Sequence, residues 1–186
     1  PGLLGYSSRA TVASEIAAAR QAQSPFMRRI ASSTLAEIRA DRELLGFALA
    51  GGRTLFAENC APCHAAGGAG RPGYPNLADD IWLWGGTLGD IETTIAHGIR
   101  WAADPDTRQS QMPGFGTIGL LNAAQISDIA EFVLSLSGSQ TDAAAAERGQ
   151  PLYARQCGVC HGPKGEGKQA IGAEAFNDKT WLYDDD

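Results

Sequence analysis

The chain has 186 residues and a formal net charge of −6, with a sequence pI near 5.0. This acidic balance argues against nucleic-acid binding, and a hydrophobic content of 44% is ordinary for one large or two small globular domains. No apolar run approaches the roughly 18 residues of a membrane helix. Because the chain begins at Pro1 rather than Met, we expect that an upstream segment has been removed.

Residues 1–42 contain neither cysteine nor histidine and are predicted to form a helical arm. Pro1–Tyr6 reads as extended or turning chain. The Ala-rich run Thr11–Gln23 predicts a helix that ends before Ser24-Pro25, and a second helical stretch covers Phe26–Arg42. The sequence favours a solvated amphipathic arm; the alternative is an arm that docks on another subunit.

All four cysteines belong to two Cys-x-x-Cys-His pentads, Cys60–His64 and Cys157–His161. This pentad is the attachment signature of c-type haem, in which each thiol forms a thioether to a porphyrin vinyl group and the histidine binds the iron from the proximal side. The sequence therefore predicts two covalently bound haem c groups. The expected thioether residues are Cys60, Cys63, Cys157 and Cys160, and the expected iron ligands are His64 and His161.

Two other uses of a Cys-x-x-Cys pair are less consistent with the sequence. A thioredoxin-like dithiol predicts a preceding strand in a βαβ pattern, and a zinc site predicts four ligands grouped in one place. Neither predicts a histidine at the fifth position twice. Covalent c-type haem implies attachment outside the bacterial cytoplasm, so we expect a periplasmic location.

The first pentad is expected to follow a helix that begins near residue 43, with a break or a helix start at Gly51-Gly52. A Gly-rich loop, Ala65–Gly73, comes after His64. We predict that the carbonyl of Pro75 accepts a hydrogen bond from Nδ1 of His64, as a proline does in class I cytochromes c, because that bond orients the ring and raises its basicity. A plain turn proline is the alternative.

The predicted distal ligand of the first haem is Met112, which lies in a Pro- and Gly-rich loop. A thioether is a soft, neutral ligand that stabilises ferrous iron, and a His/Met pair suits electron transfer because it fills both axial sites. The alternative is a loop methionine that packs on the core.

A capping box at Thr87–Asp90 opens a helix that runs to about Gly98. His97, near its end, is an alternative ligand, although a single histidine there is more typical of a surface or supporting residue.

The last helix of this unit is predicted to begin after the cap Asn122–Gln125 and to end at Gly138. Its apolar side chains recur at helical spacing. They are Ile126, Ile129, Ala130, Val133 and Leu134. We expect this stripe to pack on the helix that precedes Cys60.

The pattern then repeats. Gly52–His64 aligns with Gly149–His161 at an offset of 97 residues, and Trp82–Trp84 aligns with Trp181–Tyr183 at an offset of 99. This alignment indicates an internal duplication. Only 30 residues run from Cys157 to the last residue, against 79 from Cys60 to Gly138, so we expect a second unit that is incomplete in a truncated chain.

The expected fold class is all-α, with tandem class I cytochrome c-like domains preceded by a helical N-terminal arm. The expected boundaries are 1–42 for the arm, 43–138 for the first domain and 139–186 for the start of the second.

Four stretches resemble the di-haem subunit, subunit III, of cbb(3)-type cytochrome c oxidases. They are Gly2–Ser7, Asp80–Gly86, Ile95–Arg100 and Met112–Gly116. The resemblance implies an N-terminal membrane anchor upstream of Pro1 and two cytochrome c domains on the periplasmic side of the bacterial inner membrane. It also implies association with a catalytic haem–copper subunit and a mono-haem cytochrome subunit. Electrons would pass from a soluble donor cytochrome c through both haems to the subunit that reduces oxygen and pumps protons.

Carried over by residue, the resemblance assigns one haem to Cys60, Cys63, His64 and Met112. The second haem takes Cys157, Cys160 and His161, while His97 matches a motif histidine whose role is less secure. The family continues to a second distal methionine, whereas this chain ends in three aspartates, so the sixth ligand of the second haem is unassigned.

Two other functions stay open at this point. A di-haem peroxidase would need one iron with an open site and a nearby general base, and Met112 argues against that at the first haem. The second open function is that of a soluble di-haem electron carrier or of the cytochrome subunit of a dehydrogenase. For the electron relay we expect no chemistry by the chain itself and a salt-sensitive docking of the donor cytochrome.

Overall fold

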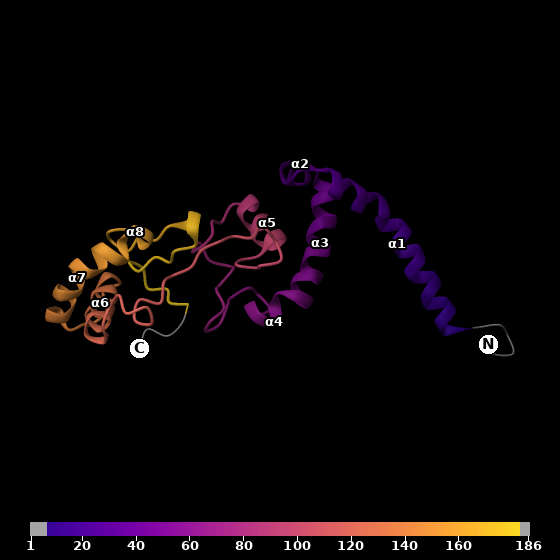
Figure 1. Cartoon of the computed structure of the whole chain (residues 1–186). Helices are drawn as coiled ribbons and strands as arrows, with labels where there is room; N and C mark the ends of the chain where they lie inside the picture. The colour runs from indigo at the N-terminus through magenta and orange to yellow at the C-terminus, as the bar shows by residue number, and fades with distance from the viewer. Residues whose placement is uncertain (1–6, 183–186) are drawn as a thin grey trace. The chain divides into compact units, whose positions relative to one another are not determined.

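Figure 1 shows the computed structural model of the chain, which describes residues 7–182. The expectations for Pro1–Tyr6, and for Tyr183 and the terminal aspartates, lie outside these residues. Over residues 7–182 the secondary structure consists of helices, turns and isolated β-bridges, which confirms the predicted all-α class. The chain divides into two compact units, Pro1–Pro62 and Cys63–Asp186. None of the described helices combines the length and the apolarity that crossing a membrane requires.

The first unit begins with a single long helix, α1 (Ser8–Ser32), so the predicted break at Ser24-Pro25 is wrong. Pro25 removes one backbone donor from the helix interior, which usually ends or kinks a helix. Here the flanking turns hold the helix together, since Arg28 donates a side-chain hydrogen bond to Oγ of Ser24 across this position. No residue of α1 is fully buried, in agreement with a largely solvated arm.

The second predicted helix of the arm is divided at Ser33-Thr34. Thr34 starts α2 (Leu35–Ala40) through a capping box with Glu37, and Asp41 then caps α3 (Arg42–Asn59) by accepting from two backbone N–H groups. Gly51-Gly52 does not interrupt α3, which corrects the predicted break. The helix tolerates the pair because its fixed first turn and continuous hydrogen bonding outweigh the weak helix propensity of glycine.

Helices α1 and α3 contact each other within the first unit. The rings of Phe26 and Phe47 stack with centroids 4.8 Å apart, and Arg29 pairs with both Asp41 and Glu43. The end of α1 is therefore attached to the helix that leads into the first pentad.

The second unit contains the two predicted capping boxes. Thr87 and Asp90 start α5 (Leu88–His97), and Asn122 and Gln125 start α6 (Ala123–Leu136). Gly138, with φ of +80°, follows the end of α6. The remaining helices of this unit are α7 (Ala143–Gln156), α8 (Gly158–His161) and a 3₁₀ turn, η1 (Gln169–Ile171). A short helix, α4 (Ala61–His64), carries Cys63 and His64.

The apolar core of the second unit lies between α6 and α7, which lie side by side (Figure 1). Its buried members are Leu121, Ile129, Tyr153 and Cys157. The stripe on α6 was predicted to pack on the helix before Cys60; its partner is instead α7, the helix before Cys157. The duplication explains this correction, because both pentads follow a helix with the same glycine and aromatic spacing.

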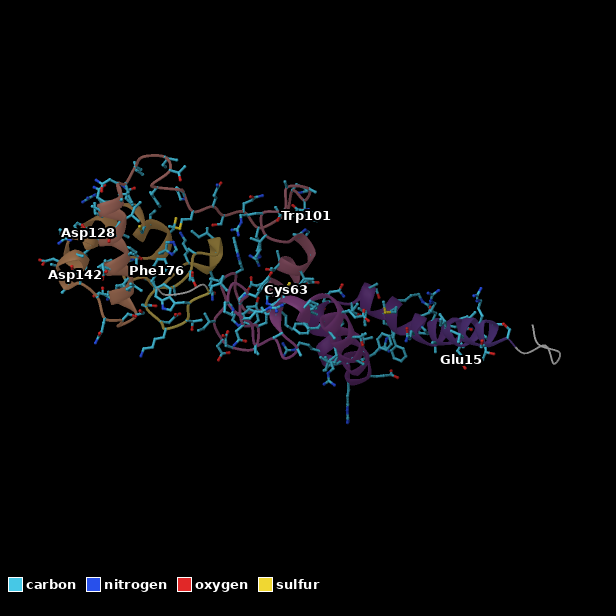
Figure 2. All side chains as sticks on the ribbon, turned by 90° about the horizontal axis from the view of Figure 1, so that it is seen from below. Glu15, Cys63, Trp101, Asp128, Asp142 and Phe176 are labelled. Atoms are coloured by element: carbon cyan, nitrogen blue, oxygen red, sulfur yellow. The ribbon has the colours of Figure 1, made fainter. Side chains whose placement is uncertain are left out.

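Gly149 lets α6 and α7 approach closely. A Cβ at this position would overlap the carbonyl oxygen of Asp128 on α6. One residue away, Arg148 donates two hydrogen bonds to the carboxylate of Asp128, with a shortest N···O distance of 2.6 Å (Asp128 is labelled in Figure 2). The helix pair thus combines backbone contact with an ion pair at its edge.

We expect Gly149→Ala to lower the free energy of unfolding by about 1–3 kcal/mol, because the added methyl group forces two backbones apart. Gly52→Ala, at the equivalent position of the first repeat, is the matched control. Its added Cβ meets no described atom within 4 Å, so alanine should be neutral or slightly stabilising. Chemical denaturation of both variants measures the difference, and equal effects would contradict this description of the helix contact.

Tyr153 generates a second prediction because it is the most buried large side chain described, at 1% exposure. Its hydroxyl donates to the carbonyl of Gly162 at 2.9 Å, and burial raises the pKa of Tyr153 to about 12. The unfolded chain, with an ordinary tyrosine pKa, loses this proton near pH 10 while the folded chain keeps it. Stability should therefore fall as the pH rises from about 10 to about 12, by at most about 2.7 kcal/mol. Denaturation curves of Tyr153→Phe between about pH 10 and about pH 12 should show no such loss of stability. A variant that loses stability with pH as the wild type does would contradict this role of Tyr153.

Candidate haem-attachment sites

The two pentads have the same local structure. Cys60 ends α3 and Cys157 ends α7, each with φ of −108° and with its N–H bonded to the carbonyl four residues earlier. A second, one-turn helix then carries the remaining cysteine and the histidine of each pentad. All four cysteines are free thiols. In each of the two pentads, the residue spacing and the one-turn helix therefore bring two thiols and one imidazole together in a short segment.

The proximal histidine of the first pentad is held by the loop that follows it. Nδ1 of His64 donates to the carbonyl of Pro75 at 2.9 Å, which confirms the predicted role of this proline. The loop is itself closed by two backbone hydrogen bonds, from Gly70 to His64 and from Leu77 to Gly68, and by the Arg71 side chain, which donates to the carbonyl of Cys63. Since Nδ1 is used, Nε2 is the ring nitrogen left to bind iron.

The second pentad repeats this arrangement with different residues. Nδ1 of His161 donates to the carbonyl of Glu174 at 2.8 Å. Gly167 bonds to the carbonyl of His161, and Phe176 bonds to the carbonyl of Gly165, at positions that match the first loop. The same bonding pattern in two loops of different sequence shows that the backbone path, rather than a particular side chain, positions the imidazole.

Glu174 is the site residue that the sequence analysis missed. Its acceptor is a backbone carbonyl, which any residue can supply, so no residue type marks it. The offset of 99 that aligns Trp82 with Trp181 also aligns Pro75 with Glu174. Applied to Pro75, this offset identifies Glu174 as the matching acceptor residue of the second repeat. Burial raises the pKa of the Glu174 carboxyl.

The surroundings of the two histidines differ. The ring of Phe176 stacks on His161 with centroids 4.2 Å apart and an interplanar angle of 20°. The corresponding residue of the first repeat is Leu77, and the ring contact of His64 is instead an edge-on approach by Tyr74 at 6.2 Å. Burial also raises the pKa of the Cys157 thiol. The second imidazole is therefore stacked against an aromatic ring, whereas the first is approached by a ring edge.

Met112 lies in the loop between α5 and α6, and its side chain is 67% exposed. Nδ1 of His97 donates to Oδ2 of Asp104 at 3.0 Å, which leaves Nε2 as its available ring nitrogen. The pKa of the Asp104 carboxyl is lowered by a hydrogen bond from the backbone of Asp106 and then by His97. Asp106 completes a group of three side chains with potential metal-ligand atoms within 4.8 Å of one another. The assignments of Met112 and His97 as haem ligands stay predictions.

The residues present fit a haem. Each pentad offers two free thiols and an imidazole whose Nε2 is available, which is the donor set of haem c. Several large apolar side chains on α5 and in the loop that contains Met112 are exposed, as expected of residues that contact a porphyrin. They are Ile95, Met112, Ile118 and Leu120, at 78%, 67%, 64% and 53% exposure.

Comparison with known proteins agrees with this geometry. The cytochrome c family profile matches residues 49–137, and the profile of "Cytochrome C oxidase, cbb3-type, subunit III" matches residues 144–184. The fold and the paired pentads thus define a tandem c-type cytochrome.

Relatives along the whole chain specify the family. The chain is 47% identical to the cbb3-type cytochrome c oxidase subunit CcoP of Azospirillum brasilense and 44% identical to that of Cereibacter sphaeroides, each over 100% of this chain. It is also 44% identical to subunit FixP of Azorhizobium caulinodans. The chain belongs to the CcoP/FixP family, subunit III of the cbb3-type oxidases. It spans 62–65% of the length of these three relatives.

The first loop generates a prediction because Gly70 has φ of +72° and a Cβ there would lie 2.7 Å from the nitrogen of Asn76. Gly70→Ala should displace the backbone that carries Pro75 and lower the free energy of unfolding by about 1–2 kcal/mol. Gly67→Ala is the control in the same loop, since its Cβ meets no described atom within 4 Å. Nitrogen NMR of the His64 ring reports the Nδ1 hydrogen bond. Retention of that bond in Gly70→Ala would refute the proposed role of the loop.

Proposed function

We propose that this chain binds two haem c groups covalently and transfers electrons between them. Cys60 and Cys63 hold the first haem, and Cys157 and Cys160 hold the second. The observation that carries the proposal is the repeated hydrogen bond from the Nδ1 atoms of His64 and His161 to a loop carbonyl, at 2.9 and 2.8 Å. This bond prepares the opposite nitrogen of each ring to bind iron.

The bound haem supplies a one-electron ferric–ferrous couple. The chain's residues determine how that couple behaves. The loop carbonyls fix the orientation of both imidazoles and raise their basicity. Met112 would be the second iron ligand of the first haem, and its neutral thioether would favour the ferrous form and leave no open iron site for a substrate. The stacking of Phe176 on His161 would give the second haem a different environment.

The names of the relatives, which are subunits of cbb3-type cytochrome c oxidases, support a role for this relay in a respiratory complex. We infer that electrons enter from a soluble donor cytochrome c, cross the two haems and continue to the catalytic haem–copper subunit. There four electrons and four protons reduce one oxygen molecule to two waters. A mono-haem cytochrome subunit is a further partner. The complete protein is held in the bacterial inner membrane by an anchor upstream of these residues, which lie on the periplasmic side. We propose the domain boundaries 1–42, 43–138 and 139–186.

The relay is tested by removing one haem at a time from the complete oxidase. Cys60→Ala/Cys63→Ala and Cys157→Ala/Cys160→Ala should each stop oxygen consumption driven by a reduced donor cytochrome, because the haems act in series. A small reductant that reduces the catalytic subunit directly should still support oxygen consumption, which controls for assembly. Donor-driven turnover that survives either loss would contradict a series relay. Peroxide turnover by the isolated, fully loaded subunit would indicate a peroxidase instead.

A further inference from the structure

Arg108 joins the loop that leads to Met112 to helix α5. Its side chain is only 15% exposed, although arginine is normally a surface residue. Nε donates to Oγ1 of Thr94 at 2.9 Å, and Nη2 donates to the backbone carbonyl of Asp90, also at 2.9 Å. One guanidinium thus makes two directed hydrogen bonds to successive turns of α5.

Two further interactions hold this charged guanidinium in place. The carboxylate of Asp90 lies 3.6 Å from Nη2, and the ring of Trp84 lies beneath the guanidinium at 5.4 Å from its centroid. The pKa of Asp90 is lowered by hydrogen bonds from Thr87 and by Arg108, so the carboxylate stays charged. The carboxylate of Asp90 therefore serves both the capping box of α5, with Thr87, and the attachment of the loop through Arg108.

The backbone of Arg108 anchors the loop at the same point. Its N–H donates to Gly98 and its carbonyl accepts from Arg100, which closes residues 98–108 into a tight loop. Inside that loop the hydroxyl of Thr107, which is 5% exposed, accepts from the backbone of Trp101. Trp101 itself lies at the outer part of this loop (Figure 2).

Met112 follows Arg108 by four residues, a span of at most about 14 Å. The side chain of Arg100 donates to the carbonyl of Ser110 at 3.2 Å and so continues the restraint toward the methionine. We propose that Arg108 is a positioning residue for Met112, holding the distal loop at the distance from α5 at which the thioether binds the first haem iron. This inference rests on the proposed ligation by Met112.

The variants separate position from charge. Arg108→Gln removes the charge and the paired hydrogen bonds, whereas Arg108→Lys keeps the charge but cannot reach Thr94 and the Asp90 carbonyl together. Thr94→Val removes one acceptor and leaves Arg108 intact. Arg148→Gln is the matched control, because it removes the same charge from an ion pair that joins α7 to Asp128 on α6.

The measurement is a titration of the complete, haem-loaded ferrous protein with imidazole, which competes with Met112 for iron. Methyl-labelled methionine gives an NMR signal shifted by the haem ring current, and Met112→Leu assigns it by its loss. Arg108→Gln should let imidazole displace this signal at about tenfold lower concentration, equivalent to about 1.4 kcal/mol. Thr94→Val should produce a smaller shift in the same direction, and Arg108→Lys should recover part of the wild-type value. Arg148→Gln should match the wild type.

The outcomes distinguish the two claims. If Met112→Leu leaves every shifted methionine signal in place, Met112 is not a ligand and the ligand assignment fails with it. If that signal is assigned to Met112 but Arg108→Gln and Thr94→Val titrate like the wild type, the positioning role alone is overturned. Equal effects of Arg108→Gln and Arg148→Gln would also overturn it, because they would reflect charge or general stability rather than loop position.

Discussion

The hydrogen bond between a proximal histidine and a loop carbonyl is the interaction on which the rest of this structure depends. A histidine next to a helix end has rotational freedom, and an imidazole that rotates makes a poor metal ligand. In both repeats the chain removes that freedom by leading a Gly-rich loop back to Nδ1. The glycines are needed where the loop turns most sharply, as the positive φ of Gly70 and Gly167 shows.

The duplication preserves backbone geometry while it varies side chains. Pro75 and Glu174 differ in every chemical respect except the carbonyl oxygen that each presents to a histidine. Around this shared frame the repeats diverge, because Phe176 stacks on His161 where the first repeat has Leu77. Two sites with the same proximal ligand and different surroundings suit a relay, since the environment around a haem sets its reduction potential.

Much of this could be predicted from residue patterns. The pentads, the caps at Thr87 and Asn122, and the role of Pro75 all depend on local chemistry that the sequence displays directly. Glu174 was missed because a backbone acceptor leaves no mark in residue type. Pro25 predicts a helix end by its residue type, but the hydrogen bonds on either side of it keep α1 continuous.

The partner of α6 was mispredicted for a different reason. Its apolar stripe specifies a face that packs on another helix, and the duplication supplies two candidate helices with the same spacing of a glycine and an aromatic residue. Only the structure distinguishes Gly149, which lies against the α6 backbone, from its counterpart Gly52. Periodicity identifies a buried face, but it does not identify which of two similar helices covers that face.

The most direct test of the central claim is the intact mass of the complete protein under denaturing conditions. Denaturation removes every group that is not covalently attached, so the mass counts the haems held by thioethers. Two haem increments are the predicted result, one for each pair of cysteines. One increment would leave a pentad without its haem and contradict the relay, and none would overturn the assignment of both sites.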